Sequence, residues 1–180
     1  MRIIGLRHGQ STYNLLGLCN DDPARPVDLT GVGVAQAEAA ARRLVAEPIE
    51  AIFASPLLRA RRTAEIVGRK IGVDVVIEPR LADIRSGYEG RPVAEYLAAI
   101  AHDPVHACAA GGESLRDYQR RVDGFLDRLA HRPLRCVLLV AHEETLRMLD
   151  AHYRRCRLGE VAGRAFANAE PYVFQSASGN

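Results

Sequence analysis

The sequence predicts an α/β domain, a three-layer α/β/α sandwich with a mostly parallel central sheet. Short apolar runs alternate along the chain with longer segments whose apolar residues recur at helical spacing. Some of the junctions carry residues typical of helix starts, such as Ser55 followed by Pro56. This alternation indicates a parallel sheet, because a connection between parallel strands usually contains a helix.

The elements can be assigned in order from these patterns. The expected strands are residues 2–6, 49–53, 73–77, 136–140 and an edge strand at 172–174. The expected helices are residues 30–45, 55–72, 93–101, 114–131 and 144–153. Thr30, Ser55 and Ser114 can cap three of these helices, and Gly72 suits the end of the second. Residues 17–26 and 80–92, which are rich in glycine and proline, are expected to be loops.

Length and composition favour a single domain over residues 1–180, with 48% hydrophobic and 26% charged residues. A formal net charge of +2 is too small to predict a nucleic-acid partner. Arg7 and His8 interrupt the first apolar run, which excludes a signal sequence or membrane span there, and we expect a cytoplasmic protein. The cysteines are too far apart to suggest a metal site, and we expect reduced thiols at Cys19, Cys108, Cys136 and Cys156.

Arg7, His8 and Gly9 directly follow the first predicted strand. Arginine offers paired donors to phosphate oxygens, a neutral histidine offers a nucleophilic nitrogen, and glycine allows close backbone approach. Arg59 and His142 also stand at junctions between a predicted strand and a helix. Ligands bind at the carboxyl ends of strands in open α/β sheets, so these side chains are expected to share one pocket.

These residues belong to a longer series of motifs in a specific order. The series is Arg7-His8-Gly9-Gln10-Ser11 with Asn14, Leu29-Thr30-Gly31 with Gln36-Ala37, Ser55-Pro56-Leu57-Leu58-Arg59-Ala60 with Thr63-Ala64, Gly111-Gly112-Glu113-Ser114 with Arg121-Val122, and Val140-Ala141-His142 with Arg147. In order and spacing the chain resembles the histidine phosphatase superfamily, the phosphoglycerate mutase-like or RHG-motif phosphatases. The resemblance covers most of the chain and implies the phosphoglycerate mutase-like form of the α/β sandwich.

The resemblance implies that His8 is a nucleophile that becomes phosphorylated. Arg7, Arg59 and His142 would surround the phosphate, and positive groups placed there make a metal or other cofactor unnecessary. We expect the ring of His8 to be neutral, with its second nitrogen donating to a backbone carbonyl. The expected substrate-binding residues are Asn14, Ser11, Gln10 and Glu143.

The sequence identifies the residue that would protonate the leaving group less clearly than it identifies the nucleophile. The position that matches the family's acid is Asp83, where the commoner pattern has glutamate, and Glu89 and Glu113 are rival donors. Glu143 and Glu144 follow His142, where small residues are often found in the family. A carboxylate beside a phosphate pocket is unfavourable unless it turns away, pairs with an arginine or takes part in proton transfer.

The leading hypothesis is a metal-independent phosphatase that hydrolyses a small phosphorylated metabolite through phosphohistidine. The alternatives are phosphoglycerate mutase-type phosphoryl transfer, a catalytically impaired phosphate-binding or regulatory module, and a protein-phosphohistidine phosphatase. Specificity is expected in residues 17–26, 84–112 and 157–168, whose loop-like composition places them around the pocket mouth. The sequence predicts neither a nucleic-acid nor a membrane partner, and it leaves a homodimer open.

Overall fold

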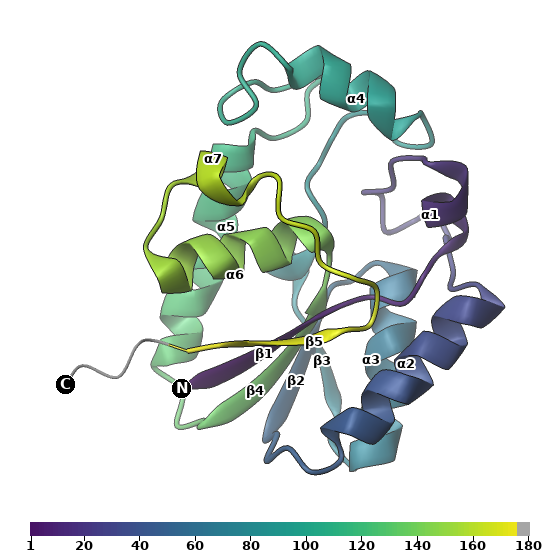
Figure 1. Ribbon diagram of the computed structural model, residues 1–180, viewed down its shortest axis with the longest axis vertical. Helices are drawn as coiled ribbons and strands as arrows, with labels where there is room; N and C mark the ends of the chain where they lie inside the picture. The colour runs from purple at the N-terminus through teal and green to yellow at the C-terminus, as the bar shows by residue number, and fades with distance from the viewer. Residues whose placement is uncertain (176–180) are drawn as a thin grey trace.

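The computed structural model describes residues 1–175, so the last five residues of the domain expected over 1–180 lie outside the described part. A five-stranded sheet with the order β3-β2-β4-β1-β5 forms its centre (Figure 1). The strands are β1 (Arg2–Arg7), β2 (Ala51–Ala54), β3 (Val75–Ile77), β4 (Cys136–Ala141) and β5 (Pro171–Phe174). β1 to β4 are parallel and β5 runs antiparallel to β1, which confirms the mostly parallel sheet.

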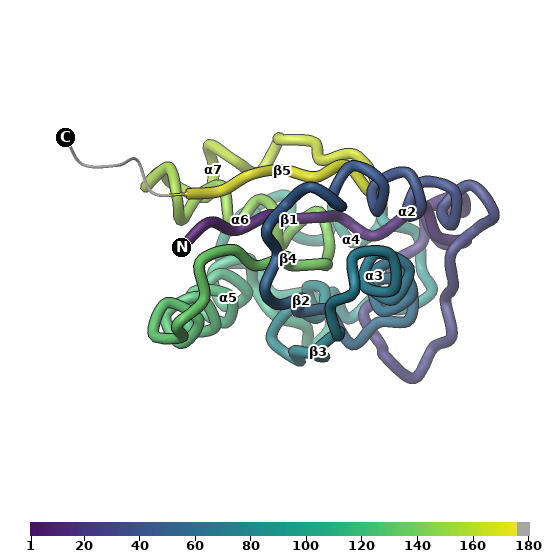
Figure 2. The backbone as a smooth tube through the Cα atoms, turned by 90° about the horizontal axis from the view of Figure 1, so that it is seen from below, coloured from purple at the N-terminus to yellow at the C-terminus, as the bar shows by residue number. Residues whose placement is uncertain are grey.

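Helices cover both faces of the sheet, as Figure 2 shows in a view turned by 90° from that of Figure 1. α2 (Gly31–Leu44) and α3 (Leu58–Ile71) lie on one face, and α5 (Leu115–Ala130) and α6 (Glu143–Arg154) lie on the other. Successive strand residues point to opposite faces. Ile3 therefore packs in the core with α5 and α6, while Ile4 packs in the core with α2 and α3. The predicted three-layer sandwich is confirmed.

The predicted strands and long helices are all present, with strand ends within two residues of the expected positions. Thr30 caps α2, Ser114 caps α5, and Gly72 ends α3 in the left-handed conformation. The predicted cap at Ser55 is wrong, because α3 begins at Leu58 with Leu57 as its N-cap. The Ser55 hydroxyl accepts a hydrogen bond from the Leu57 amide, which precedes the helix. Its other partner is the ring of His142, which lies outside α3.

Three short helices were not expected from the sequence. These are α1 (Thr12–Leu16), the 3-10 helix η1 (Pro79–Leu81) and α7 (Leu158–Val161). Each contains five residues or fewer, so none is long enough to establish a helical repeat of apolar residues. Among residues 1–175, none of the helices combines the length and apolar character needed to cross a bilayer.

The segment after α1 is joined to α4 (Val93–Ile100), and both lie beyond the carboxyl ends of the strands (Figure 1). The Val93 amide donates to the Gly17 carbonyl over 2.9 Å, and the Cys19 amide donates to the Arg91 carbonyl over 2.9 Å. These backbone bonds connect two of the segments in which we expected specificity residues. They place both segments beside the strand ends that carry the predicted site.

Candidate active site

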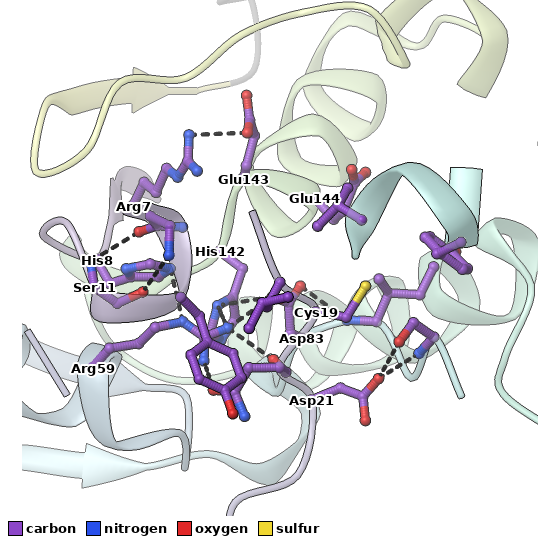
Figure 3. Close-up of a pocket in the computed structure, with 18 of the residues that line it drawn as sticks. Arg7, His8, Ser11, Cys19, Asp21, Arg59, Asp83, His142, Glu143 and Glu144 are labelled. Atoms are coloured by element: carbon purple, nitrogen blue, oxygen red, sulfur yellow. Dashed lines mark hydrogen bonds and ion pairs between the residues drawn. The ribbon is translucent and has the colours of Figure 1, made fainter. Parts of the chain in front are cut away.

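The carboxyl ends of β1 and β4 and the start of α3 surround one pocket of about 190 Å³. His8 directly follows β1, and its amide donates to the Ala141 carbonyl of β4 over 2.9 Å. His142 directly follows β4, and its ring centroid is 5.3 Å from that of His8. Arg59 reaches both rings from the first turn of α3 (Figure 3). The structure thus brings together the side chains that the sequence places at three separate strand-to-helix junctions.

The ring of His8 is held in one tautomer. Its Nδ1 lies 2.7 Å from the Gly9 carbonyl, which can only accept, so Nδ1 carries the proton. Arg59 Nε donates to His8 Nε2 over 2.9 Å, so that nitrogen presents its lone pair. Burial, followed by the charge of Arg59, holds the pKa of His8 well below its ordinary value. His8 is therefore a neutral imidazole with an unprotonated nitrogen in the pocket.

Close backbone packing fixes the segment that carries His8. A Cβ added at Gly9 would lie 2.3 Å from the Gly33 carbonyl oxygen, and one added at Gly33 would lie 2.0 Å from the Gln10 carbonyl oxygen. The Gly9 amide also donates to the Thr63 hydroxyl over 3.0 Å. The glycine in the predicted triplet is therefore needed for contact with α2, while a hydroxyl on α3 holds its amide.

Arg59 is buried and uses its guanidinium to connect the pocket. It donates to the side-chain oxygen of Asn20, to the Asn20 carbonyl over 3.0 Å, and to Asp83 Oδ2 over 3.0 Å. Burial lowers the pKa of Arg59, while the carboxylate of Asp83 opposes that shift. No motif in the sequence distinguishes Asn20 as a site residue, because its segment, residues 17–26, has only the composition of a loop.

His142 and Asp83 lie next to each other in the lining of the pocket. Asp83 Oδ2 lies 3.2 Å from His142 Nδ1, and the Ser55 hydroxyl lies 2.7 Å from His142 Nε2. Burial and then the charge of Arg59 hold the pKa of His142 well below its ordinary value. Burial raises the pKa of Asp83, and the charge of Arg59 opposes this shift. Ser55 was missed as a site residue because its position before Pro56 suggested a helix cap.

Arg7 and Glu143 form an ion pair at the rim, with 2.9 Å between Arg7 NH1 and Glu143 Oε2. Arg7 NH1 also donates to the Phe166 carbonyl over 2.8 Å. Glu143 Oε1 accepts the Phe166 amide over 3.1 Å and lies 3.3 Å from Arg147. The carboxylate that follows His142 is thus neutralised by two arginines. Among residues 1–175, Arg7 Nε is buried without a hydrogen-bond partner, so an unsatisfied donor lies on a residue that lines the pocket.

The predicted substrate-binding residues separate into two groups. Ser11 and Asn14 line the pocket and form the capping box that starts α1. Because Asn14 Oδ1 accepts the Ser11 amide, the NH2 group of Asn14 is the part that can serve a ligand. Gln10 does not line the pocket, since its side-chain oxygen accepts the Thr30 hydroxyl over 3.0 Å.

Of the three candidate proton donors, Asp83 alone lines the pocket. Glu89 is occupied by the backbone amides of Asp21 and Asp22, over 2.7 and 3.0 Å. Glu113 is buried and pairs with Arg121. Both rivals therefore hold loops in place outside the pocket.

The three expected specificity segments differ in their relation to the pocket. Residues 17–26 and 84–112 contribute side chains to its wall, whereas 157–168 contribute none. That third segment instead supports two site residues from outside the pocket. Asn168 donates to the His8 carbonyl over 2.8 Å, and the Phe166 carbonyl accepts a hydrogen bond from Arg7. Within residues 1–175, no group of three or more His, Cys, Asp and Glu side chains is arranged to hold a metal ion.

The fold and the pocket define an α/β sandwich with a paired-histidine, paired-arginine site at the carboxyl edge of its sheet. The family model described as histidine phosphatase superfamily, branch 1, matches residues 3–180. The chain belongs to this superfamily, which confirms the resemblance seen in its motifs.

Similar proteins include phosphatases and a mutase. The adenosylcobalamin/alpha-ribazole phosphatase of Salmonella typhimurium is 32% identical over 160 residues, which cover 84% of this chain and 78% of that protein. A 2,3-bisphosphoglycerate-dependent phosphoglycerate mutase of Methylobacterium is 36% identical over 159 residues, covering 79% of this chain and 76% of that protein.

A solved mycobacterial structure shares the fold. The glucosyl-3-phosphoglycerate phosphatase in complex with VO3 superimposes with a TM-score of 0.83 at 28% identity, covering 96% of this chain and 90% of that one. The chain is therefore similar to proteins with both hydrolase and mutase names.

Proposed function

We propose that this protein is a metal-independent phosphatase that hydrolyses a small phosphomonoester through a phosphohistidine on His8. The observation that carries the proposal is the state of His8, whose Nδ1 is held by the Gly9 carbonyl while Nε2 keeps its lone pair. A neutral imidazole in a fixed tautomer is suited to nucleophilic attack. The membership of the superfamily and the names of its phosphatase relatives support the same reaction class.

Two guanidiniums would bind the phosphoryl oxygens. Arg59 Nε now donates to His8 Nε2 and would exchange that bond for a phosphate oxygen, which frees the nucleophile as the substrate binds. Arg7 Nε has no partner in the described part of the chain and would donate to a second oxygen. Cations placed around the transferring group stabilise the charge that its oxygens carry in the transition state.

The reaction would proceed in two steps, the formation and the hydrolysis of the phosphohistidine. In the first, the Nε2 lone pair of His8 forms a bond to phosphorus, the bond from phosphorus to the ester oxygen breaks, and the Asp83 carboxyl gives its proton to the departing oxygen. In the second, water attacks phosphorus, its proton goes to the Asp83 carboxylate, and the electron pair of the N–P bond returns to Nε2. The raised pKa of Asp83, caused by burial, supports a carboxyl that can hold a proton between steps.

Phosphate release from para-nitrophenyl phosphate, in the presence of a metal chelator, tests the proposal. The His8→Ala variant is expected to lose turnover, and the Asp83→Asn variant is expected to lose about 10²- to 10⁴-fold in kcat. His102→Ala is the matched control, because His102 is an exposed histidine outside the pocket and its replacement should leave the rate unchanged.

An alkaline quench should trap a labelled phosphoenzyme on the wild-type protein and none on the His8→Ala variant, since phosphohistidine survives in base. Isomerisation of a phosphoglycerate without release of phosphate would replace the phosphatase proposal by the mutase. If no activated ester gave either a labelled phosphoenzyme or released phosphate, the function would be that of a catalytically impaired phosphate-binding module. Cytoplasmic location and a homodimer remain predictions.

A further inference from the structure

The pocket has two unlike parts, which Figure 3 shows on its two sides. Arg7 and Arg59 accompany the two histidines, and no other arginine or lysine lines the pocket formed by the described residues. Both of these cations are needed for the phosphoryl group. A substrate with a second anionic group would therefore find no cation left to pair with it.

The part away from His8 carries carboxylates. Asp21 lines the pocket, and its Oδ2 accepts both the amide and the hydroxyl of Ser86 over 2.6 Å. Within residues 1–175, no basic side chain forms an ion pair with Asp21. Its position is fixed by Ser86 while its charge is left uncompensated, so it presents a negative charge to whatever occupies this part of the pocket.

Glu144 also lines this side of the pocket, apart from Asp21 (Figure 3). It pairs with Arg147, but that guanidinium also lies 3.3 Å from Glu143. Glu143 also pairs with NH1 of Arg7, whereas the phosphate would take Nε of that residue. Arg147 is shared between two carboxylates, Glu143 and Glu144.

The pocket also has apolar residues in its lining. Leu18, Val93 and Leu97 line it together with Tyr13 and Tyr96. Val93 and Leu97 are 37% and 54% exposed, so a ligand in the pocket can remove apolar area from water. Burying such area favours binding. An apolar body attached to the phosphate oxygen would gain this contribution.

We propose that the substrate is a phosphomonoester of an alcohol that carries an ammonium group on an apolar or aromatic body. The ammonium lies on the side of the pocket that carries Asp21 and Glu144, and the apolar body lies against α4. Esters of hydroxy acids are poor substrates, because their carboxylate meets this negatively charged wall. The inference rests on the proposed phosphatase function and adds the chemistry of the leaving group.

Three aryl phosphates with the same ring test the inference. Phosphotyramine carries an ammonium, 4-ethylphenyl phosphate is neutral, and 4-(phosphonooxy)phenylacetate carries a carboxylate, while the phenol that leaves is similar in all three. The expected kcat/KM falls from the ammonium to the neutral to the carboxylate ester by about tenfold at each step, the effect of about 1.4 kcal/mol. The ratio should shrink as salt is added, since ions screen charges near the surface.

Two isosteric variants locate the effect. At pH 8, above the pKa of about 7 to which burial raises Glu144, Asp21→Asn and Glu144→Gln are each expected to reduce the ratio of kcat/KM between the ammonium and carboxylate esters by about threefold to tenfold. Glu95→Gln is the matched control, because Glu95 lies exposed on α4 outside the pocket lining, and its variant should keep the wild-type ratio. Two separate variants keep the test valid if one of them folds poorly.

The outcomes separate the inference from the function on which it rests. Equal kcat/KM values for the three esters, or faster hydrolysis of the carboxylate ester, would overturn the inference while His8-dependent turnover still supports the phosphatase. Ratios that neither variant changes would also overturn it, since the selectivity would then arise elsewhere. Absence of turnover together with absence of a phosphoenzyme would overturn both.

Discussion

Replacing Gly33 by alanine tests the backbone contact that holds the His8 segment against α2. Gly33 is the third residue of this helix, and a Cβ there would lie 2.0 Å from the Gln10 carbonyl oxygen and 2.9 Å from the Gln10 amide nitrogen. Carbon atoms pack favourably at about 3.5–4.0 Å, so the two segments would have to separate by more than about 1 Å. The obstructing atoms belong to the backbone and cannot rotate away.

Two opposing effects set the change in stability. Helix propensity alone would make alanine more favourable than glycine by about 0.8–1.0 kcal/mol. Overpacking costs about 1–3 kcal/mol, and the upper end applies here because the contact is with backbone. The Gly33→Ala variant is therefore expected to lose about 2 kcal/mol, which lowers Tm by about 4–8 °C in a chain of this size. Gln10 stands two residues after His8, so kcat/KM should fall as well, by up to about 100-fold for an ångström of displacement.

Thermal unfolding and kcat/KM with para-nitrophenyl phosphate measure both effects. Gly124→Ala is the matched control, since Gly124 lies in α5 with open space around its Cβ position. This variant is expected to gain about 0.8–1.0 kcal/mol from helix propensity and to raise Tm by about 2–4 °C. If Gly33→Ala behaved like Gly124→Ala in both stability and rate, the close contact between α2 and the His8 segment would be refuted.

Three further predictions concern single side chains. Asn20→Ala leaves a buried donor of Arg59 without its partner, at a cost of about 1–3 kcal/mol. Steady-state kinetics should therefore show kcat/KM lowered about 5- to 150-fold. An unchanged value of kcat/KM would contradict the contact between Asn20 and Arg59. Tyr118→Phe removes the 2.6 Å hydrogen bond to the Thr145 hydroxyl inside the core, and urea unfolding should show a loss of about 0.5–1.5 kcal/mol with little change in kcat. Burial raises the pKa of Glu144 from 4.5 to about 7, so the folded protein holds this proton more tightly than the unfolded chain and loses stability as the pH rises from about 4.5 through 7. Relative to wild type, Glu144→Gln should therefore be more stable at pH 8 than at pH 5 in urea unfolding, and an equal difference at both pH values would count against the shift.

The long elements were predictable because their signals are local. Apolar residues repeat at helical spacing in α2 and α3, and the chain around β4 is continuously apolar, as expected for a strand buried on both faces. The start of α3 was not predictable, since Ser55 can either cap a helix or bond to His142, and only the packed structure decides between these partners. The short helices lacked a repeat long enough to detect.

The candidate site was predictable in part for a topological reason. His8 and His142 each follow a strand, and the carboxyl ends of parallel strands meet at one edge of the sheet. No comparable topological rule predicts which loop residues reach the site. Asn20, which holds Arg59, and Gln10, which faces Thr30 instead of the pocket, are positioned by contacts between segments distant in sequence.

The sequence by itself determined the fold class and the residues that meet at the strand ends, because periodicity and strand-end position are properties of short segments. The resemblance of its ordered motifs indicated the superfamily. The tertiary structure decided which of three carboxylates enters the pocket, since Glu89 and Glu113 are used by loops while Asp83 reaches Arg59 and His142. It also decided that Glu143 is neutralised by Arg7 and Arg147. Charge pairs and desolvation depend on distances between remote segments, and those distances exist only once the chain has packed.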